Sequence, residues 1–161
     1  MSYNVTKAKA SSEKFQTFED LDVYKAAREF RKAMYAVTRR LPDFEKYDLA
    51  SQIRRAAVSL TNNIAEGHGR YHYLDQIKFT LQARGSLEEL IDDLNVCADE
   101  GYVAIEEIGA LKQQGWRTRQ LIDGYIRYLR EQKNASNPSS ARESSPIYDE
   151  VETENDSRLS I

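Results

Sequence analysis

Four long stretches of the chain carry apolar residues at alternating steps of three and four, which is the spacing of one face of an α-helix. The first predicted helix begins at Thr17, where Glu19 and Asp20 follow as acids of a first turn. We expect Pro42 to end it, because the residue before a proline is pushed out of the helical region. Its predicted core face is Val23, Ala27, Phe30, Met34, Val37 and Leu41.

The second predicted helix begins near Asp43 or Phe44 and ends at Gly67 and Gly69. Its apolar stripe is Leu49, Ile53, Ala57, Leu60 and Ile64. The third runs from about Tyr73 to Glu100 and has two apolar seams: Ile77, Leu81 and Ile91, and Ala83, Leu87, Leu90, Leu94 and Cys97.

The fourth predicted helix runs from about Ala104 to Lys133 and has the most regular repeat, which resembles a coiled-coil seam. That seam is Ile108, Leu111, Gly115, Thr118, Ile122, Tyr125 and Leu129. Connections of a few residues make each helix turn back on the one before it. The sequence therefore predicts an all-α protein, an antiparallel up-down-up-down four-helix bundle over residues 17–133.

The segments outside the bundle are polar and lack periodicity. Residues 1–16 and 134–161 cannot bury enough apolar surface to offset the entropy of ordering, so we expect disordered tails at both ends. No apolar run is long enough to cross a membrane, and the N-terminus lacks the apolar core of a secretory signal. With a single cysteine, Cys97, the chain is expected in the cytoplasm.

Charge is distributed unevenly along the chain, whose formal net charge is −3. The tail over residues 134–161 carries two arginines and six acids, and residues 85–111 carry eight acids with no lysine or arginine. In the predicted bundle Arg39, Arg40 and Lys46 lie at the same end as these eight acids. Residues 15–133 carry 18 basic and 19 acidic residues, so the predicted bundle is nearly neutral. A nearly neutral bundle counts against a strong, general affinity for nucleic acid.

A basic and aromatic cluster is predicted at the opposite end of the bundle. It is formed by Arg70, Lys78, Arg127, Arg130 and Lys133, diluted by Asp75 and Glu131, with Tyr71, Tyr73, Tyr125 and Tyr128 nearby. Such a charge cluster is either a solvated face or a surface on which exposed bases could stack. Arg70, Lys78, Arg127, Arg130, Lys133, Tyr125 and Tyr128 are the candidate nucleic-acid-binding residues.

Polar residues also occur where the helical periodicity predicts positions near the core. Gln52, Ser59, Asn63 and Glu66 recur along the second helix with Arg55 beside them, and Arg84 and Glu88 interrupt a seam of the third. One interpretation is an internal network that pairs Glu66 with Arg84 or Arg70, and Arg55 with Glu88. The other is an interface between copies of the chain, or a ligand groove.

No catalytic or metal-binding pattern is present in the sequence. The two histidines, His68 and His72, do not follow a glutamate by three residues as di-iron bundles require, so exposed loop histidines are expected. Cys97 lies on an apolar seam with no histidine near it in sequence, which is typical of a packed thiol. We therefore expect no enzyme activity, no metal and no cofactor.

Three separated segments form a recognisable pattern. They are Phe18-Glu19-Asp20-Leu21-Asp22-Val23-Tyr24, the stretch from Leu49 to Gly67 followed by Arg70, and Ala83-Arg84-Gly85-Ser86-Leu87-Glu88-Glu89-Leu90 with Gly101-Tyr102. Over roughly residues 15–133 the chain resembles a bacterial family of four-helix bundle proteins encoded within intervening sequences of large-subunit ribosomal RNA genes. The motif positions here are Gln52, Arg54, Arg55, Ser59, Asn63, Glu66, Arg70, Arg84, Gly85 and Glu88. Because they coincide with the polar rows described above, we expect them, Arg54 included, to form a structural network within a subunit or between subunits.

The resemblance implies a homopentamer and no enzyme activity. It also implies a distant relationship to accessory proteins of diversity-generating retroelements, which work with a reverse transcriptase and its RNA. We expect a non-catalytic scaffold or a nucleic-acid-binding accessory protein, with RNA favoured over DNA. The alternative is a protein–protein adaptor that works through the acidic tail, where Ile147 and Tyr148 form a short apolar island. The tail could also lie over a basic face and compete with nucleic acid.

Overall fold

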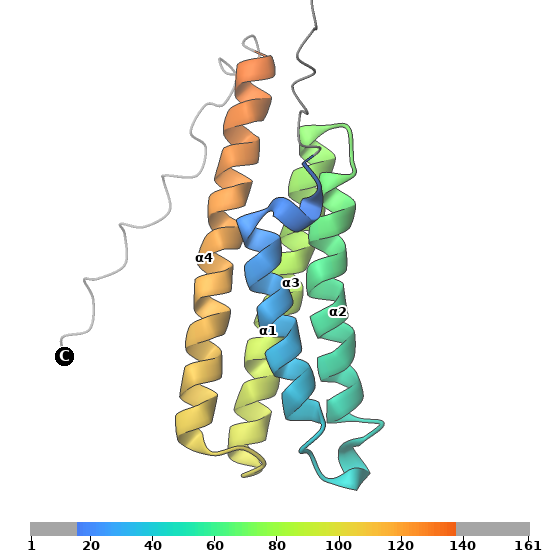
Figure 1. Ribbon diagram of the computed structural model, residues 1–161, viewed down its shortest axis with the longest axis vertical. Coiled ribbons are helices and arrows are strands. Elements are labelled where there is room, and N and C mark those ends of the chain that lie inside the picture. The colour runs from blue at the N-terminus through green and yellow to red at the C-terminus, as the bar shows by residue number, and fades with distance from the viewer. Residues whose placement is uncertain (1–15, 138–161) are drawn as a thin grey trace, which may run out of the picture.

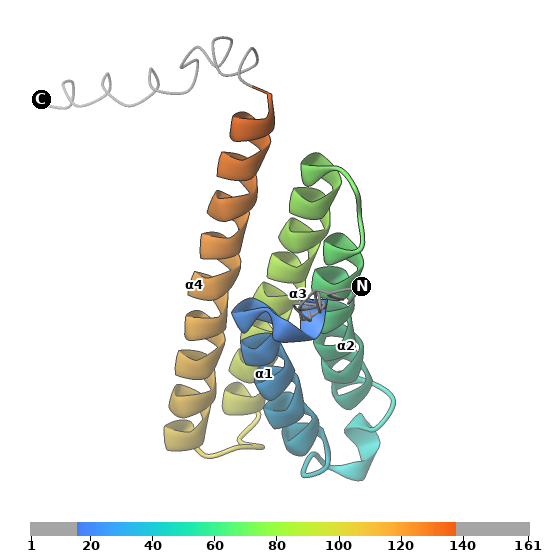
Figure 2. The same ribbon diagram turned by 45° about the horizontal axis from the view of Figure 1, so that its top comes forward.

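The computed structural model describes residues 16–137 and has four helices packed side by side (Figure 1). They are α1 (Asp22–Thr38), α2 (Leu49–His68), α3 (Tyr73–Asp99) and α4 (Ile105–Ser136), with two single-turn 3₁₀ helices, η1 (Phe18–Asp20) and η2 (Asp43–Glu45). Successive helices run in opposite directions (Figures 1 and 2). Since the described residues contain no strand, the predicted all-α bundle is confirmed. Residues 1–15 and 138–161, where most of the predicted disorder falls, lie outside the described part of the chain.

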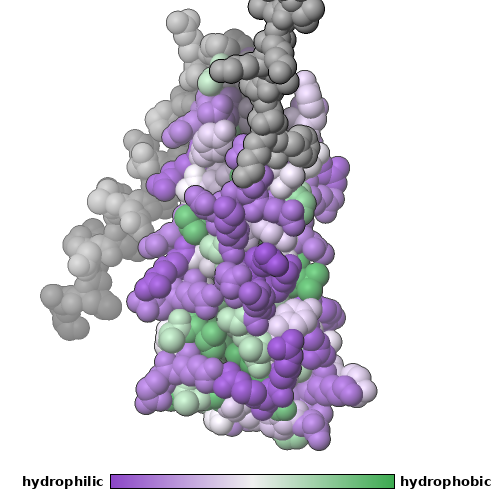
Figure 3. Space-filling view, viewed as in Figure 1, coloured by the Kyte–Doolittle hydropathy of each residue, from purple (hydrophilic) through white to green (hydrophobic). Residues whose placement is uncertain are grey.

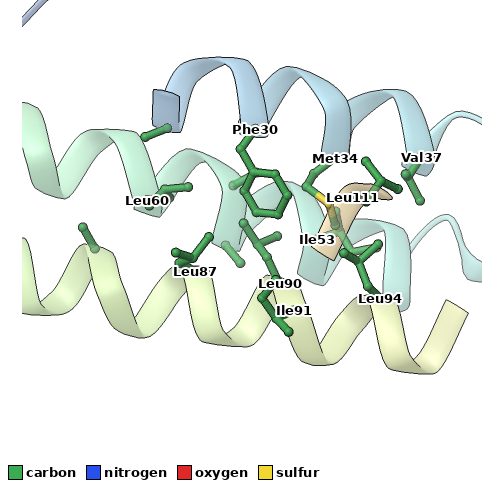
Figure 4. Close-up of a cluster of buried hydrophobic side chains, with 14 of the residues drawn as sticks. Phe30, Met34, Val37, Ile53, Leu60, Leu87, Leu90, Ile91, Leu94 and Leu111 are labelled. Atoms are coloured by element: carbon green, nitrogen blue, oxygen red, sulfur yellow. The ribbon is translucent and has the colours of Figure 1, made fainter. Parts of the chain in front are cut away.

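The core is one continuous cluster of apolar side chains along the bundle axis. Every predicted core residue of α1 and α2 is buried, and so are Leu87, Leu90, Leu94 and Cys97 of α3. Figure 4 shows side chains of α1, α2 and α3 meeting Leu111 of α4. Full burial of a side chain of this size contributes roughly 1.5–3 kcal/mol, so this cluster supplies most of the driving force for folding.

The structure corrects the predicted start and end of the first helix. Thr17 caps η1, not α1: its side chain accepts a hydrogen bond from the Glu19 backbone N–H, and Asp20 accepts one from the Thr17 N–H. Leu21 is extended, so α1 begins at Asp22. The helix ends at Thr38, before Pro42, although Leu41 is still buried. Thr17 and Pro42 therefore lie outside α1, and the helix is shorter than predicted at both ends.

The second helix also begins later than predicted. Asp43 and Phe44 belong to η2, and α2 starts at Leu49, whose backbone N–H donates to the Glu45 carboxylate at 3.1 Å. The other carboxylate oxygen of Glu45 accepts from the Tyr102 hydroxyl at 2.9 Å. Glu45 therefore satisfies the first backbone N–H of α2 and ties this end of the helix to the connection between α3 and α4.

Three further predictions, one about the end of α2 and two about the faces of α3, were wrong in detail. Gly67 does not stop α2 but packs inside it, because a Cβ there would meet the Phe79 Cβ at 3.0 Å. Leu81 was placed on a core seam but is 41% exposed. Arg84 and Glu88 do not interrupt the core either; they lie at its edge on the side of α3 that faces α4.

The helices differ in length, so the bundle is uneven at one end. α1 has 17 residues and α4 has 32, which correspond to about 25 and 48 Å of helix. α4 therefore extends beyond the start of α1, where η1 crosses the bundle (Figure 2). None of the helices between residues 16 and 137 is long and apolar enough to cross a membrane.

Close packing of α4 against α1 and α3 depends on the absence of a side chain at Gly115. A Cβ at this position would lie 2.5 Å from Ile91 Cδ1 and 3.1 Å from Phe30 Cζ. Gly109, two turns earlier in the same helix, is exposed and has no atom within 4 Å of its hypothetical Cβ. The two glycines form a matched pair.

We predict opposite effects of alanine at these two glycines. Gly115→Ala should lower the free energy of unfolding by about 1–2 kcal/mol, since displacement of Ile91 and the Phe30 ring outweighs the gain in helix propensity. Gly109→Ala should raise it by about 0.5–1 kcal/mol, because only the propensity changes. Urea unfolding followed by circular dichroism measures both. Equal stabilisation by the two substitutions would contradict the tight α1–α3–α4 contact.

Candidate functional site

The predicted basic and aromatic cluster lies at one end of the bundle, where α2 ends, α3 begins and α4 ends (Figure 2). Arg70 is not free there: its guanidinium pairs with Glu66 at 2.5 Å and lies 4.7 Å from the Phe79 ring centroid. The rings of Tyr125 and Tyr128 are stacked, with their centroids 6.2 Å apart. Burial raises the pKa of the Tyr125 hydroxyl. Lys78, Arg127 and Arg130 are exposed, and Lys133 is half-buried.

The predicted polar network separates into two groups, the first of which joins α2 to α3. The Ser59 and Ser86 hydroxyl groups lie 2.8 Å apart, and the Asn63 side-chain amide donates to both the Ser59 hydroxyl and its carbonyl, at 3.0 and 2.9 Å. Gln52 lies in the same row of α2 but is exposed. The Ser59–Ser86 bond joins α2 to α3, and the Asn63 bonds, which lie within α2, hold Ser59 in place.

The second group joins α3 to α4. Arg84 lies 3.4 Å from Asp123, and Arg119 lies 3.6 Å from Asp123 and 2.5 Å from Glu88. The Glu88 contact is an ion pair without hydrogen-bond geometry. The predicted Arg55–Glu88 pair therefore does not form, because Glu88 faces α4. Of the two predicted partners for Glu66, Arg70 is the one observed.

A row of basic side chains follows the outer face of α1 and α2. We call it the basic track and define it as Arg31, Lys32, Arg39, Lys46, Arg54 and Arg55. α1 is in front in the view of Figure 3, where hydrophilic residues cover most of the surface. Tyr35 lies within the track, with Arg31 and Arg39 one turn before and after it.

Three hollows follow the track and share its residues. The first, of about 480 Å³, is lined by Tyr35, Arg54, Arg55, Val58, Ser59, Asn62 and Asn63. The second, of about 330 Å³, is lined by Arg31, Lys32, Tyr35 and Arg39. The third, of about 250 Å³, extends past Pro42 to Lys46, and Asp43 is the one acidic residue among those that line it. Tyr35, Arg39 and Arg54 each line two hollows, so the three are neighbours.

Most cations of the track have no carboxylate partner among the described residues. Only Lys32 forms an ion pair, with Glu29 at 3.2 Å, and both side chains are 59% exposed. Arg31 donates to the Thr61 hydroxyl at 2.8 Å, and Arg54 donates to the Lys46 carbonyl at 3.0 Å. Both arginines therefore have no carboxylate partner among the described residues, which gives this face a local excess of positive charge.

Four arginines elsewhere in the bundle are paired with carboxylates, whereas the exposed Arg28, Arg117, Arg127 and Arg130 have no ion pair among the described residues. Arg40 pairs with Glu107 through both guanidinium nitrogens, at 2.9 and 2.5 Å, and Arg70, Arg84 and Arg119 have the carboxylate partners given above. The sequence shows three basic pairs, Arg31-Lys32, Arg39-Arg40 and Arg54-Arg55. It does not show that the pairs of the first helix lie beside the pair of the second, because this depends on how α1 packs on α2. Sequence reasoning assigned Arg54 and Arg55 to a structural network and so did not find the track.

Buried titratable groups do not form a reaction centre in the described bundle. Burial raises the pKa of Cys97 to about 11, so its thiol stays protonated at neutral pH. His68 is the last residue of α2 and half-buried, not in a loop as predicted, while His72 is exposed. Within residues 16–137 no three His, Cys, Asp or Glu side chains are grouped so that they could hold a metal ion.

Asp93 is the one strongly perturbed carboxyl group in the described residues. It is 6% exposed, and its Oδ2 has no hydrogen-bond partner there. Burial, followed by the charges of Glu89 and Asp92, raises its pKa from 3.8 to about 6. Because the folded state favours the protonated form, this group destabilises the fold increasingly as the pH rises through 6.

We predict that Asp93→Asn stabilises the protein at high pH. At pH 8 the free energy of unfolding should rise by about 1–3 kcal/mol, because the ionised, unsatisfied carboxylate is removed. At pH 4, where wild-type Asp93 is protonated in the folded state, the gain should fall below about 1 kcal/mol. Thermal melts at both pH values, with exposed Asp75→Asn near the other end of α3 as the control, measure the difference. A gain independent of pH would contradict the raised pKa.

Comparison with known proteins identifies one family. The family model described as 23S rRNA-intervening sequence protein matches residues 19–124, about two thirds of the chain. The match covers α1, α2 and α3 and the first two thirds of α4. It therefore includes the whole basic track, but not Arg127, Arg130 and Lys133. No curated protein matches the chain.

Proposed function

The chain belongs to the 23S rRNA-intervening sequence protein family, and we propose that this member is a non-catalytic scaffold that binds RNA. We further propose that it assembles as a homopentamer and works with a reverse transcriptase, as the family resemblance implies, and that it does so in the cytoplasm. RNA would bind on the outer face of α1 and α2. The single observation that carries this proposal is the basic track.

The composition of the track matches the requirements of a phosphate-binding surface. Its hollows are lined by six cations and one acid, and among the described residues only Lys32 is paired with a carboxylate. Lysine and arginine side chains that neutralise phosphates release condensed counterions, which supplies most of the free energy of nonspecific binding. The guanidinium groups of Arg54 and Arg55 can each bind a phosphate through two nitrogens.

The net charge of −3 does not argue against this surface, because the acids are concentrated elsewhere. The eight acids of residues 85–111 belong to α3, to the beginning of α4 and to the connection between them. Steering of a polyanion depends on the local potential at the surface that it approaches, not on the net charge of the whole chain.

Assembly would strengthen binding by each copy. One track offers a modest number of phosphate contacts, whereas several copies joined in a ring present several tracks to one RNA. Linked sites raise the effective concentration for each further contact, so weak contacts become a high overall avidity. This supports a scaffold role for the oligomer.

We predict that charge reversal on the track weakens RNA binding. Arg54→Glu/Arg55→Glu should lower the affinity for structured RNA by at least about 10-fold near 50 mM salt. The plot of log affinity against log salt concentration should also become shallower, by the amount expected for the loss of about two phosphate contacts. The matched control, Arg127→Glu/Arg130→Glu, makes the same charge change in the other cluster and should cost less. Filter binding across a salt series measures both, with circular dichroism to verify folding.

Two outcomes would contradict the proposal. Absence of RNA binding by the wild-type protein at low salt, where electrostatic contacts are strongest, would exclude an RNA-binding function. A larger loss from the Arg127/Arg130 pair than from the Arg54/Arg55 pair would move the site to the cluster predicted from sequence.

The alternative function, a protein–protein adaptor, depends on the acidic tail, of which only residues 134–137 are described. Truncation after Asn137 removes a segment with two arginines and six acids. We predict that the truncated protein binds RNA at least as tightly as the full chain, since negative charge is removed. Filter binding tests this, and weaker binding would contradict it. Loss of a protein partner captured by the full chain would favour the adaptor.

A further inference from the structure

The first hollow of the track contains more than cations. Tyr35 and half-buried Val58 contribute apolar surface, and Asn62 and Asn63 contribute amide groups. Its volume of about 480 Å³ falls within the roughly 300–1,000 Å³ typical of small-ligand sites. A surface that bound phosphates by charge alone would require neither the aromatic ring nor the amides. The hollow therefore suits a ligand that has an anionic part and a flat, polar-edged part.

Tyr35 occupies the central position. It is half-buried in α1, and its hydroxyl group has no hydrogen bond with any residue in the described range. It lines both the first and the second hollow, with Arg54 and Arg55 in one and Arg31 and Arg39 in the other. An aromatic ring between two sets of guanidinium groups is the arrangement in which a base stacks while the phosphates on either side of it are neutralised.

The amide groups of α2 can contact the edge of such a base. Asn63 uses its amide nitrogen on Ser59, which leaves its side-chain oxygen as an acceptor, while Asn62 is exposed and has both groups available among the described residues. Asparagine side chains offer a donor and an acceptor in one plane, which match the edges of nucleobases. Val58 would contact the apolar face of the base.

We propose that the track takes single-stranded RNA, with one unpaired base stacked on Tyr35 in the first hollow and the adjoining phosphates on Arg31, Arg39, Arg54 and Arg55. This inference rests on the proposed function and specifies its substrate. In an A-form duplex the bases are stacked inside and the major groove is too deep and narrow for side chains. A duplex could reach the cations but not Tyr35. Because the second and third hollows continue the track, the ligand is a strand and not a free nucleotide.

Fluorescence anisotropy with the full-length protein tests the proposal. The probes are a fluorescein-labelled single-stranded RNA of about 12 nucleotides, within the site sizes of single-strand binders, and the same strand annealed to its complement. We expect tighter binding of the single strand near 50 mM salt. Tyr35→Ala should weaken single-strand binding by roughly 10-fold or more and should leave duplex binding within about twofold. Tyr35→Phe, which keeps the ring, should bind like the wild type.

Three further variants protect the test against a folding defect. Asn62→Ala changes an exposed side chain of the hollow and should weaken single-strand binding a few-fold. Tyr128→Ala removes a 52% exposed tyrosine from the opposite cluster and should have no effect. Tyr35→Trp should bind the single strand and show quenching of its fluorescence by the stacked base, whereas Trp116 on α4 should not be quenched.

The outcomes separate this inference from the proposed function. If wild type binds single strand and duplex equally and Tyr35→Ala changes neither, the stacked base is excluded while electrostatic RNA binding stands. If Tyr128→Ala is the variant that loses single-strand binding, the stacking site lies at the other end of the bundle and the inference is wrong. If neither probe binds at low salt, both proposals fail together.

Discussion

The contact of Phe30, Ile91 and Gly115 fixes the positions of three helices, and the rest of the structure depends on it. The missing side chain at Gly115 lets α4 approach closely enough for Ile91 of α3 and the Phe30 ring of α1 to fill the space beside it. Protein interiors are packed as densely as organic crystals, so this fit tolerates little adjustment. α1 packs against α4 on one side and α2 on the other, so its outer rows of side chains lie beside those of α2.

The two halves of the surface follow from this register. The α3–α4 seam brings acids opposite arginines, and the pairs Arg84–Asp123 and Arg119–Glu88 neutralise each other there. The α1–α2 seam brings together cations whose neighbours are Thr61, a backbone carbonyl and Tyr35. Exposed ion pairs contribute little to stability, and uncompensated cations contribute less. The basic track therefore contributes little to the stability of the fold, and the ligand-binding role proposed for it does not conflict with a structural one.

Several features of the fold were predictable because they are local in sequence. The stripe from Val23 to Val37 and that from Leu49 to Ile64 identified the buried faces of α1 and α2, and the bounds of α3 were accurate within a residue. The start of α2 was not predictable in this way. Asp43 and Phe44 form a separate turn with Glu45. The Glu45 carboxylate accepts hydrogen bonds from the Leu49 backbone N–H and from the hydroxyl group of Tyr102, a residue 57 positions further along the chain. Local propensity does not contain such a contact.

The sequence by itself determined the number of helices, their apolar faces, their antiparallel order and the family, because these depend on periodicity and on motifs read along the chain. Only the tertiary structure decided which polar residues meet. Arg55 and Glu88 looked like partners on neighbouring helices, yet Glu88 faces α4 and Arg55 lines an open hollow. A helical wheel gives each side chain a direction but not a neighbour, since the neighbour depends on the rotation and register of a second helix. The basic track around Tyr35 exists only because that packing sets α1 and α2 side by side.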